Sequence, residues 1–323
     1  MRKIYVIGIG AGDPDQLTVQ AVKALRRVDV FFLLDKGAET SDLIGLRHEI
    51  LRRHAGESAG GRGYRLVEVR DPERERAADT AGYPGTVEEW RSRRAALCER
   101  AIIDELSDGE DPDGTEDPDG TGDPDGTKGP DRDRTGAFLV WGDPSLYDST
   151  LPVLEEILAR GSVRFEYEVI PGISSVSALA ARHRVGLTRV GRPVQITTGR
   201  RLAEGWPDGV DDVVVMLDAH ESFRHQLAAD PVIHWGAYVG TDDEILVSGR
   251  LSEVADRIGE LRSEARARKG WIMDTYLLRR DQGPGRGGPQ GGARAPPGPD
   301  GRPAPPDRNR KKKIGPSPTT PPP

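Results

Sequence analysis

The sequence predicts an α/β fold of two domains, each with a mainly parallel or mixed sheet flanked by helices. Short segments rich in apolar and β-branched residues indicate strands, four in the first half of the chain and six in the second. Helical segments alternate with the early strands, and this alternation favours a largely parallel sheet covered on both faces. A length of 323 residues is enough for two domains and a sizeable core.

The strands are expected at regular intervals along the chain. In the first half they are 3–9, 28–34, 64–70 and 137–141, and in the second half 165–170, 193–197, 212–217, 233–239, 244–249 and 272–278. This division predicts an N-terminal domain of residues 1–141 and a C-terminal domain of residues 142–280. A ligand cleft is expected between the two domains.

Three helices have clear signals. Residues 17–25 place apolar side chains on one face, and residues 86–106 form a long polar and apolar pattern. A third helix begins near Leu151, with Pro152 in its first turn and Gly161 after its end. Proline suits the first turn of a helix and glycine suits the position just past its last turn.

A glycine-rich loop follows the first strand, in the stretch Gly8-Ile9-Gly10-Ala11-Gly12-Asp13-Pro14. Glycine lets the backbone approach a ligand closely and adopt a positive φ. The dinucleotide fingerprint requires a third glycine where this chain has Asp13, and a carboxylate there would repel a pyrophosphate. Asp35 mimics the ribose-binding acid only in part, so nicotinamide binding is disfavoured. A tight turn without a ligand stays an alternative.

Two later junctions also follow predicted strands. One is Gly142-Asp143-Pro144-Ser145-Leu146-Tyr147, and the other is Pro171-Gly172-Ile173-Ser174-Ser175. In this order and placement, the three junctions resemble those of the tetrapyrrole methylases, a family that uses S-adenosylmethionine. The resemblance implies that this cofactor lies in the cleft between the two domains.

Further stretches resemble particular members of that family. They are residues 31–37, 192–201, 215–220 and 270–280, and the whole resemblance covers about 1–107 and 136–280. It implies methylation of precorrin-5 at carbon 1 with loss of acetate, a step of aerobic cobalamin synthesis, by a homodimer. Other family substrates (a different precorrin, diphthamide or ribosomal RNA) stay as alternatives. A non-catalytic nucleotide-binding protein is a further alternative.

The resemblance also implies which residues border S-adenosylmethionine. They are Gly10, Ala11, Gly12, Gly142, Asp143, Leu146, Ser174, Ser175, Leu217 and Gly240. Asp143 and the two serines could instead only cap helices, and Leu217 could be plain core. Carbonyl oxygens and aromatic faces suit a sulfonium, and no metal site is legible in the sequence.

A tetrapyrrole carries many carboxylates, which the planar guanidinium of arginine binds well. The expected substrate-binding residues are Lys36, Arg184, Arg189, Arg192, Arg200 and Arg201, although a solvated helix face and loop would look the same. Deacetylation could use a general base, and His220 has the most suitable intrinsic pKa. Asp35 and Tyr147 are further catalytic candidates, while Tyr147 could instead pack in the core.

Composition favours a cytoplasmic protein. The chain has one cysteine, Cys98, and no signal-peptide or membrane-spanning pattern. Residues 108–135 carry an acidic DPDGT repeat with a local charge of −8, and residues 281–323 carry +5 and thirteen of the 26 prolines. Both segments are expected to be disordered. The basic tail does not indicate specific binding of nucleic acid.

Overall fold

The structure is a computed structural model that describes residues 2–35, 41–56, 63–72, 83–106 and 134–280. Met1–Asp281 groups as one compact unit. The expected tail and almost all of the expected acidic insert lie outside the described residues, as does Lys36. Thr135, which was assigned to the insert, instead begins a strand.

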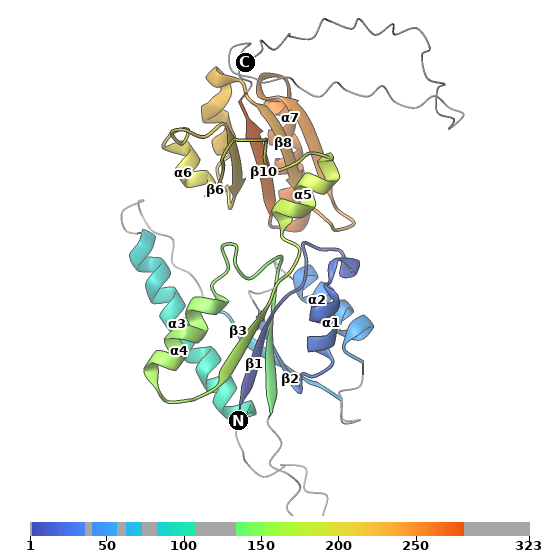
Figure 1. The fold of residues 1–323 in the computed structure, drawn as a ribbon, viewed down its shortest axis with the longest axis vertical. Helices are drawn as coiled ribbons and strands as arrows, with labels where there is room; N and C mark the ends of the chain where they lie inside the picture. The colour runs from blue at the N-terminus through green and yellow to red at the C-terminus, as the bar shows by residue number, and fades with distance from the viewer. Residues whose placement is uncertain (1, 36–40, 57–62, 73–82, 107–133, 281–323) are drawn as a thin grey trace, which may run out of the picture. The chain divides into compact units, whose positions relative to one another are not determined.

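The first sheet is entirely parallel (Figure 1). Its strands are β1 (Lys3–Gly8), β2 (Val30–Asp35), β3 (Arg65–Arg70), β4 (Thr135–Val140) and β5 (Glu166–Ile170), in the order β3-β2-β4-β1-β5. The central strands are nearly continuous apolar runs, which is the pattern of parallel strands buried on both faces.

Helices cover both faces of the first sheet. Figure 1 shows α1 (Val19–Leu25) and α2 (Ser41–His54) on one side, and α3 (Tyr83–Glu105) and α4 (Thr150–Arg160) on the other. Helix α1 begins two residues later than predicted because the Thr18 hydroxyl accepts a hydrogen bond from the Ala21 N–H and caps it, after the short helix η1 (Pro14–Gln16).

The second sheet is mixed. Its strands are β6 (Val194–Thr198), β7 (Asp212–Met216), β8 (Val232–Ala237), β9 (Ile245–Arg250) and β10 (Asp274–Arg279), in the order β6-β7-β10-β8-β9. Only β6 and β7 run parallel, and the other three pairings are antiparallel. This sheet is the mixed form of the predicted mainly parallel or mixed sheet, and the connection from β8 to β9 is too short for the crossover that a parallel pairing needs.

The helices of the second half are α5 (Ser175–His183), α6 (Gly199–Ala203), η3 (Ser222–Ala229) and α7 (Leu251–Lys269). Helix α7 packs with α6 and η3 on one face of the second sheet, and α5 packs on the other face. The buried residues of α7 recur at helical spacing, at Leu251, Ala255, Ile258, Arg262 and Ala265. This signal was legible in the sequence, although no helix was predicted there.

The α/β fold with two sheets is confirmed, and each of the ten predicted strands overlaps an observed one. The division at residues 141 and 142 needs correction, because β5 belongs to the first sheet and pairs with β1 from Lys3↔Glu166 onward. Helix α4 serves as the crossover that returns the chain beside β1, as a parallel pairing requires. The first sheet is complete only after Ile170.

Candidate active site

Three loops meet at the carboxyl ends of the strands of the first sheet. Strands β4, β1 and β5 are neighbours and parallel, so the loops that follow them emerge side by side. Gly10 and Gly142 exchange backbone hydrogen bonds of 3.3 and 2.8 Å. The Asp143 carboxylate accepts a hydrogen bond of 2.9 Å from the Gly172 N–H. The three loops are thereby fastened to one another.

The close packing of these loops requires glycine. A Cβ atom added to Gly172 would lie 2.8 Å from the backbone of Gly8, and closer still to the Gly142 carbonyl oxygen. At Gly10, where φ is +82°, an added Cβ atom would lie 2.8 Å from the Gln16 Cβ atom. Gly10 is therefore needed for the turn itself, which supports the tight-turn alternative at this position.

A cavity of about 210 Å³, here called the smaller cavity, opens beside these loops. Among the predicted cofactor residues, it is lined by Gly142, Asp143, Leu146, Ser174, Ser175 and Leu217. Tyr147 also lines it, as do Arg47 from α2 and Met273 just before β10. The structure thus brings together six residues from three separate segments of the sequence.

A second cavity of about 560 Å³, here called the larger cavity, shares Leu43 and Trp141 with the smaller one. The predicted residues Gly12 and Gly240 line it, whereas Gly10 and Ala11 line neither of these cavities. Its aromatic residues are Trp141, Tyr238 and Trp271, and its basic residues are Arg53, Arg182 and Lys269. Acidic neighbours balance these bases, as in the 2.6 Å ion pair of Lys269 with Asp243.

Tyr147 and Leu217 are apolar side chains held in unusual conformations at the smaller cavity. Their side chains are 48% and 61% exposed, so the core alternative is wrong for both. Their φ angles are +50° and +55°, and a left-handed conformation costs an L-residue roughly 1–2 kcal/mol. Such strain persists only where the surroundings impose it. Both residues therefore offer fixed apolar surface to a ligand.

The buried carboxylate of Asp218 fixes the loop that carries Leu217. It accepts hydrogen bonds from the Ser222 N–H (2.6 Å), the Ser222 hydroxyl (2.9 Å) and the Tyr276 hydroxyl (2.6 Å). Arg262 donates to the Asp218 carbonyl oxygen. Burial, together with the neighbouring Asp218 carboxylate, raises the pKa of Tyr276 well above its usual value. The Tyr276 hydroxyl therefore stays protonated and donates a hydrogen bond in this network. The sequence analysis did not predict the network.

Asp143 and Ser174 have structural partners as well as cavity positions. Burial alone would raise the pKa of Asp143, but hydrogen bonds from Ser145 and the Gly172 N–H outweigh it and lower that pKa. Asp143 is consequently a carboxylate at neutral pH. The Ser174 hydroxyl caps α5 by accepting from the Ser177 N–H at 3.1 Å, so its capping role is observed. Ser175 reaches the Thr275 hydroxyl at 3.4 Å.

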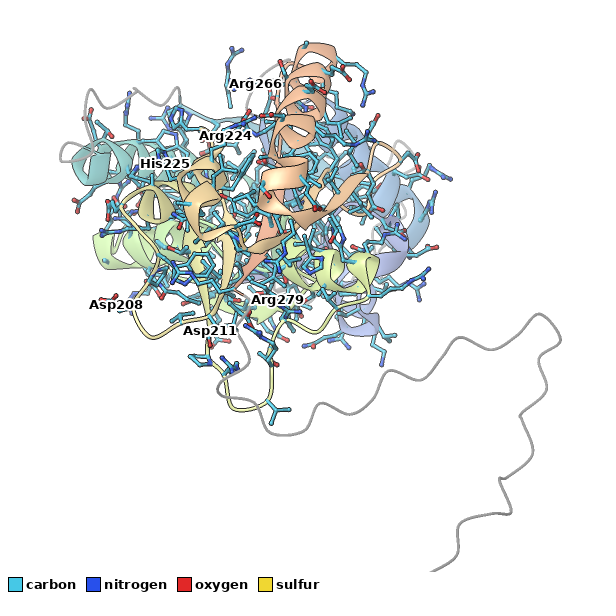
Figure 2. The ribbon with its side chains drawn as sticks, turned by 90° about the horizontal axis from the view of Figure 1, so that it is seen from above. Asp208, Asp211, Arg224, His225, Arg266 and Arg279 are labelled. Carbon is cyan, nitrogen blue, oxygen red and sulfur yellow. The ribbon has the colours of Figure 1, made fainter. Side chains whose placement is uncertain are left out.

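The structure does not bring the predicted substrate arginines to either cavity. Arg189 forms a two-pronged ion pair with Asp212 at 2.7 and 2.9 Å, and Arg192 pairs with Asp211. Asp212 begins β7, whereas Leu217 follows its far end, roughly 16 Å away at strand spacing. Figure 2 labels Asp211 near Arg279, which lies within 3.5 Å of Asp212.

The remaining arginines of that set also lie outside the two cavities. Arg201 pairs with Glu204 on the surface at 2.8 Å, and the side chains of Arg184 and Arg200 are exposed. Arg184 ends α5 in a left-handed conformation with φ of +57°. These positions fit the solvated alternative more closely than a site for substrate carboxylates.

The catalytic candidates are separated in space. Tyr147 lines the smaller cavity, and burial raises the pKa of its hydroxyl. His220 is exposed and Asp35 is half-buried at the end of β2, and neither lines the two cavities. Sequence reasoning missed Arg47, Trp141 and Lys269. Within the described part of the chain, no group of three His, Cys, Asp or Glu residues is placed to hold a metal, and no helix could span a membrane.

Comparisons with known proteins identify the family of the chain. The sequence model of the Tetrapyrrole (Corrin/Porphyrin) Methylases matches residues 3–111 and 130–255. A Precorrin-6A synthase [deacetylating] from Sinorhizobium sp is 44% identical over 280 residues, which are 87% of this chain and 96% of that protein.

Solved structures give the same result. The crystal structure of a putative cobalamin synthesis related protein (CobF) from Corynebacterium diphtheriae is similar with a TM-score of 0.67 and 35% identity, over 87% of this chain and 99% of that chain. A uroporphyrin-III-C-methyltransferase from Thermus thermophilus, at 22% identity and a TM-score of 0.51, shares the fold over 86% of this chain and 92% of its own. The chain therefore belongs to the tetrapyrrole methylase family and is a methyltransferase.

Proposed function

We propose that this chain methylates carbon 1 of precorrin-5 and releases acetate, which yields precorrin-6A in aerobic cobalamin synthesis. The observation that carries the proposal is the 44% identity to a deacetylating precorrin-6A synthase across 96% of that relative. The convergence of the loops after β4, β5 and β7 on the smaller cavity supports it. In this reaction S-adenosylmethionine supplies the methyl group.

The residues around the smaller cavity fit S-adenosylmethionine. Leu217 and Tyr147 present exposed apolar surface that suits an adenine ring, and Gly142 lines the cavity wall without a side chain. Asp143 is ionised and half-buried there, which favours a positively charged ligand without a direct contact being required. The chain's contribution to catalysis is to hold the two reactants in line and to exclude water.

The larger cavity is the proposed site of the macrocycle. It adjoins the smaller cavity at Leu43 and Trp141, and Trp271, backed by the buried Tyr238, provides an aromatic wall. Tyr238 donates a 2.6 Å hydrogen bond to the Trp271 carbonyl oxygen, and their rings meet edge to face. This support makes the wall rigid, which lowers the entropy lost when a ring system binds.

The catalytic base for deacetylation remains a prediction. Tyr147 is the one predicted catalytic residue that lines the smaller cavity, and its raised pKa makes it a proton donor at neutral pH. His220 stays a candidate on the grounds of its intrinsic pKa alone. The homodimer, the cytoplasmic location and the absence of a metal cofactor are likewise predictions from the sequence.

The decisive experiment incubates the protein with precorrin-5 and methyl-labelled S-adenosylmethionine. Label in the tetrapyrrole together with one equivalent of free acetate is the expected result. Label without acetate would indicate methylation of a different position, and transfer only to another precorrin would indicate a different family substrate. Calorimetry with S-adenosylhomocysteine separates all methylase functions from a non-catalytic protein, which would not bind it.

A further inference from the structure

Two guanidinium groups line the smaller cavity, and they differ in their partners. Arg94 is buried and pairs with the Asp71 carboxylate through two hydrogen bonds, and a third bond reaches the Ser149 hydroxyl. Arg47, on α2, donates only to backbone carbonyl oxygens, at Leu43 (3.1 Å) and Leu139 (3.4 Å). Arg94 is therefore saturated, whereas Arg47 is not.

Arg47 lacks an ion-pair partner among the described residues. Asp148, whose charge raises the pKa of Arg47, accepts a hydrogen bond of 2.7 Å from the Thr150 N–H at the start of α4. A guanidinium has five N–H donors, and the hydrogen bonds to Leu43 and Leu139 use only two of them. Burial lowers the pKa of Arg47, and the Asp148 carboxylate, which lines the same cavity, offsets this shift only in part.

We propose that Arg47 binds a carboxylate inside the smaller cavity, as a substrate-recognition residue of the methyltransferase reaction. A partly buried cation without a counter-ion is costly, and an incoming carboxylate would remove that cost. The planar fork of arginine matches a carboxylate in a two-pronged arrangement. The carbonyl oxygens of Leu43 and Leu139 accept hydrogen bonds from the Arg47 guanidinium, so its orientation is fixed before the ligand enters.

The proposal rests on the proposed function, since that reaction brings two sources of carboxylate to the cavity. One is the amino-acid part of S-adenosylmethionine, and the other is the set of acidic side chains around the tetrapyrrole. Both present the same group to Arg47. The two sources can be distinguished by binding one reactant at a time.

The test compares Arg47→Gln with Arg52→Gln, a control on the same helix whose exposed arginine pairs with Glu49. Calorimetry measures the affinity for S-adenosylhomocysteine and for 5′-methylthioadenosine, which has the adenosine and thioether but no carboxylate. Steady-state kinetics measures KM for precorrin-5. Loss of a charged hydrogen-bonded pair corresponds to an effect of roughly tenfold to a hundredfold.

If S-adenosylmethionine supplies the carboxylate, Arg47→Gln lowers the affinity for S-adenosylhomocysteine by that factor and leaves the affinity for 5′-methylthioadenosine unchanged. If the tetrapyrrole supplies it, both nucleosides bind normally and KM for precorrin-5 rises by that factor. Unchanged affinity and KM would overturn the proposal, and so would an equal loss for both nucleosides, which would indicate a distorted cavity. Arg47→Lys, which keeps the charge without the fork, should show the same pattern with a smaller effect and replaces Arg47→Gln if that variant does not fold.

Wild-type protein and the control separate this proposal from the proposed function. If neither turns over precorrin-5 but both bind S-adenosylhomocysteine, the assigned reaction is wrong while the nucleoside arm still tests Arg47. If both turn over precorrin-5 and Arg47→Gln behaves like them in every arm, only the role of Arg47 is refuted.

Discussion

Replacing Gly172 with alanine should damage the site and the fold together. Gly172 lies where the loop after β5 passes against Gly8 at the end of β1 and against the Gly142 carbonyl oxygen after β4. Its N–H also donates to Asp143 at 2.9 Å. An added methyl group therefore meets backbone on both sides, and backbone in fastened loops cannot rotate away as a side chain can.

The structure sets the size of the effect. The new Cβ atom would lie 2.8 Å from the Gly8 Cα and carbonyl carbon atoms and nearer still to the Gly142 oxygen. Relieving that overlap requires the loops to separate, and overpacking of this kind costs roughly 1–3 kcal/mol. Alanine has less conformational entropy than glycine in the unfolded chain, and this raises the free energy of unfolding by less than about 1 kcal/mol. We expect a net loss near 2 kcal/mol in the free energy of unfolding.

The assay is urea unfolding of Gly172→Ala, followed by calorimetry with S-adenosylhomocysteine. Gly186→Ala is the matched control, because its added Cβ atom would have its nearest contact at 3.4 Å and its φ is not positive. The control should change stability by less than about 0.5 kcal/mol. A Gly172→Ala protein with wild-type stability and wild-type affinity would refute the argument that these loops are locked by close backbone packing.

Three further predictions concern single side chains. Burial, with His183 and Arg279 nearby, lowers the pKa of His234 to about 4, so its contribution to stability is complete above about pH 6.5 and is lost as the pH falls toward 4. The free energy of unfolding in urea should be about 1 kcal/mol lower at pH 5 than at pH 7, a difference that partial exposure has already reduced. The difference should disappear in His234→Gln, and a variant that kept the same dependence on pH would contradict the prediction. Leu217→Gly should raise the melting temperature slightly, because glycine adopts a φ of +55° without strain. The same variant should bind S-adenosylhomocysteine more weakly, and tighter binding would argue against a contact of Leu217 with the ligand. His220→Asn should methylate the substrate and release acetate at the same rates as the wild-type protein, because His220 is exposed. Accumulation of a methylated, still acetylated product would instead identify His220 as the base.

The strands were predictable because their signal is local. An apolar run closed by glycine, proline or aspartate is visible without knowledge of the partner strand. Strand pairing is not local, and two features of the pairing were therefore not predicted. β5 was assigned to the second domain although it pairs with β1, and the antiparallel pairings around β10 were not foreseen. Only the short link between β8 and β9 carried a hint of the antiparallel arrangement.

The cavity residues divide in the same way. Gly142, Ser174 and Leu217 each follow a strand, so their position at one end of a sheet could be predicted. The arginines between 184 and 201 were grouped by closeness in sequence, although β7 places Asp212 and Asp211, the partners of Arg189 and Arg192, at the opposite end from Leu217. Sequence distance does not report which end of a strand a residue reaches.

Arg47 was missed because its helix was missed. Helix α2 is rich in polar residues, and its apolar face, formed by Leu43, Leu46, Ile50 and Leu51, covers little more than one stripe. A count of apolar residues at helical spacing would have found that stripe. It would not have shown that the arginine within it turns toward a cavity, since this depends on the carbonyl oxygens that hold its fork.

The two walls of the smaller cavity are held by different physical means, and this difference predicts how each responds to mutation. The Gly142 wall is locked from outside the cavity by the Gly172 backbone packed against Gly8 and the Gly142 carbonyl oxygen, so a side chain added at Gly172 must move the first sheet and lower stability. The Leu217 wall is a strained loop held by the buried Asp218 carboxylate and its donors. Strain imposed by surroundings is released when the side chain or its support is altered. Mutations in this second wall should therefore reduce ligand affinity before they reduce stability, whereas mutations in the first wall should reduce both together.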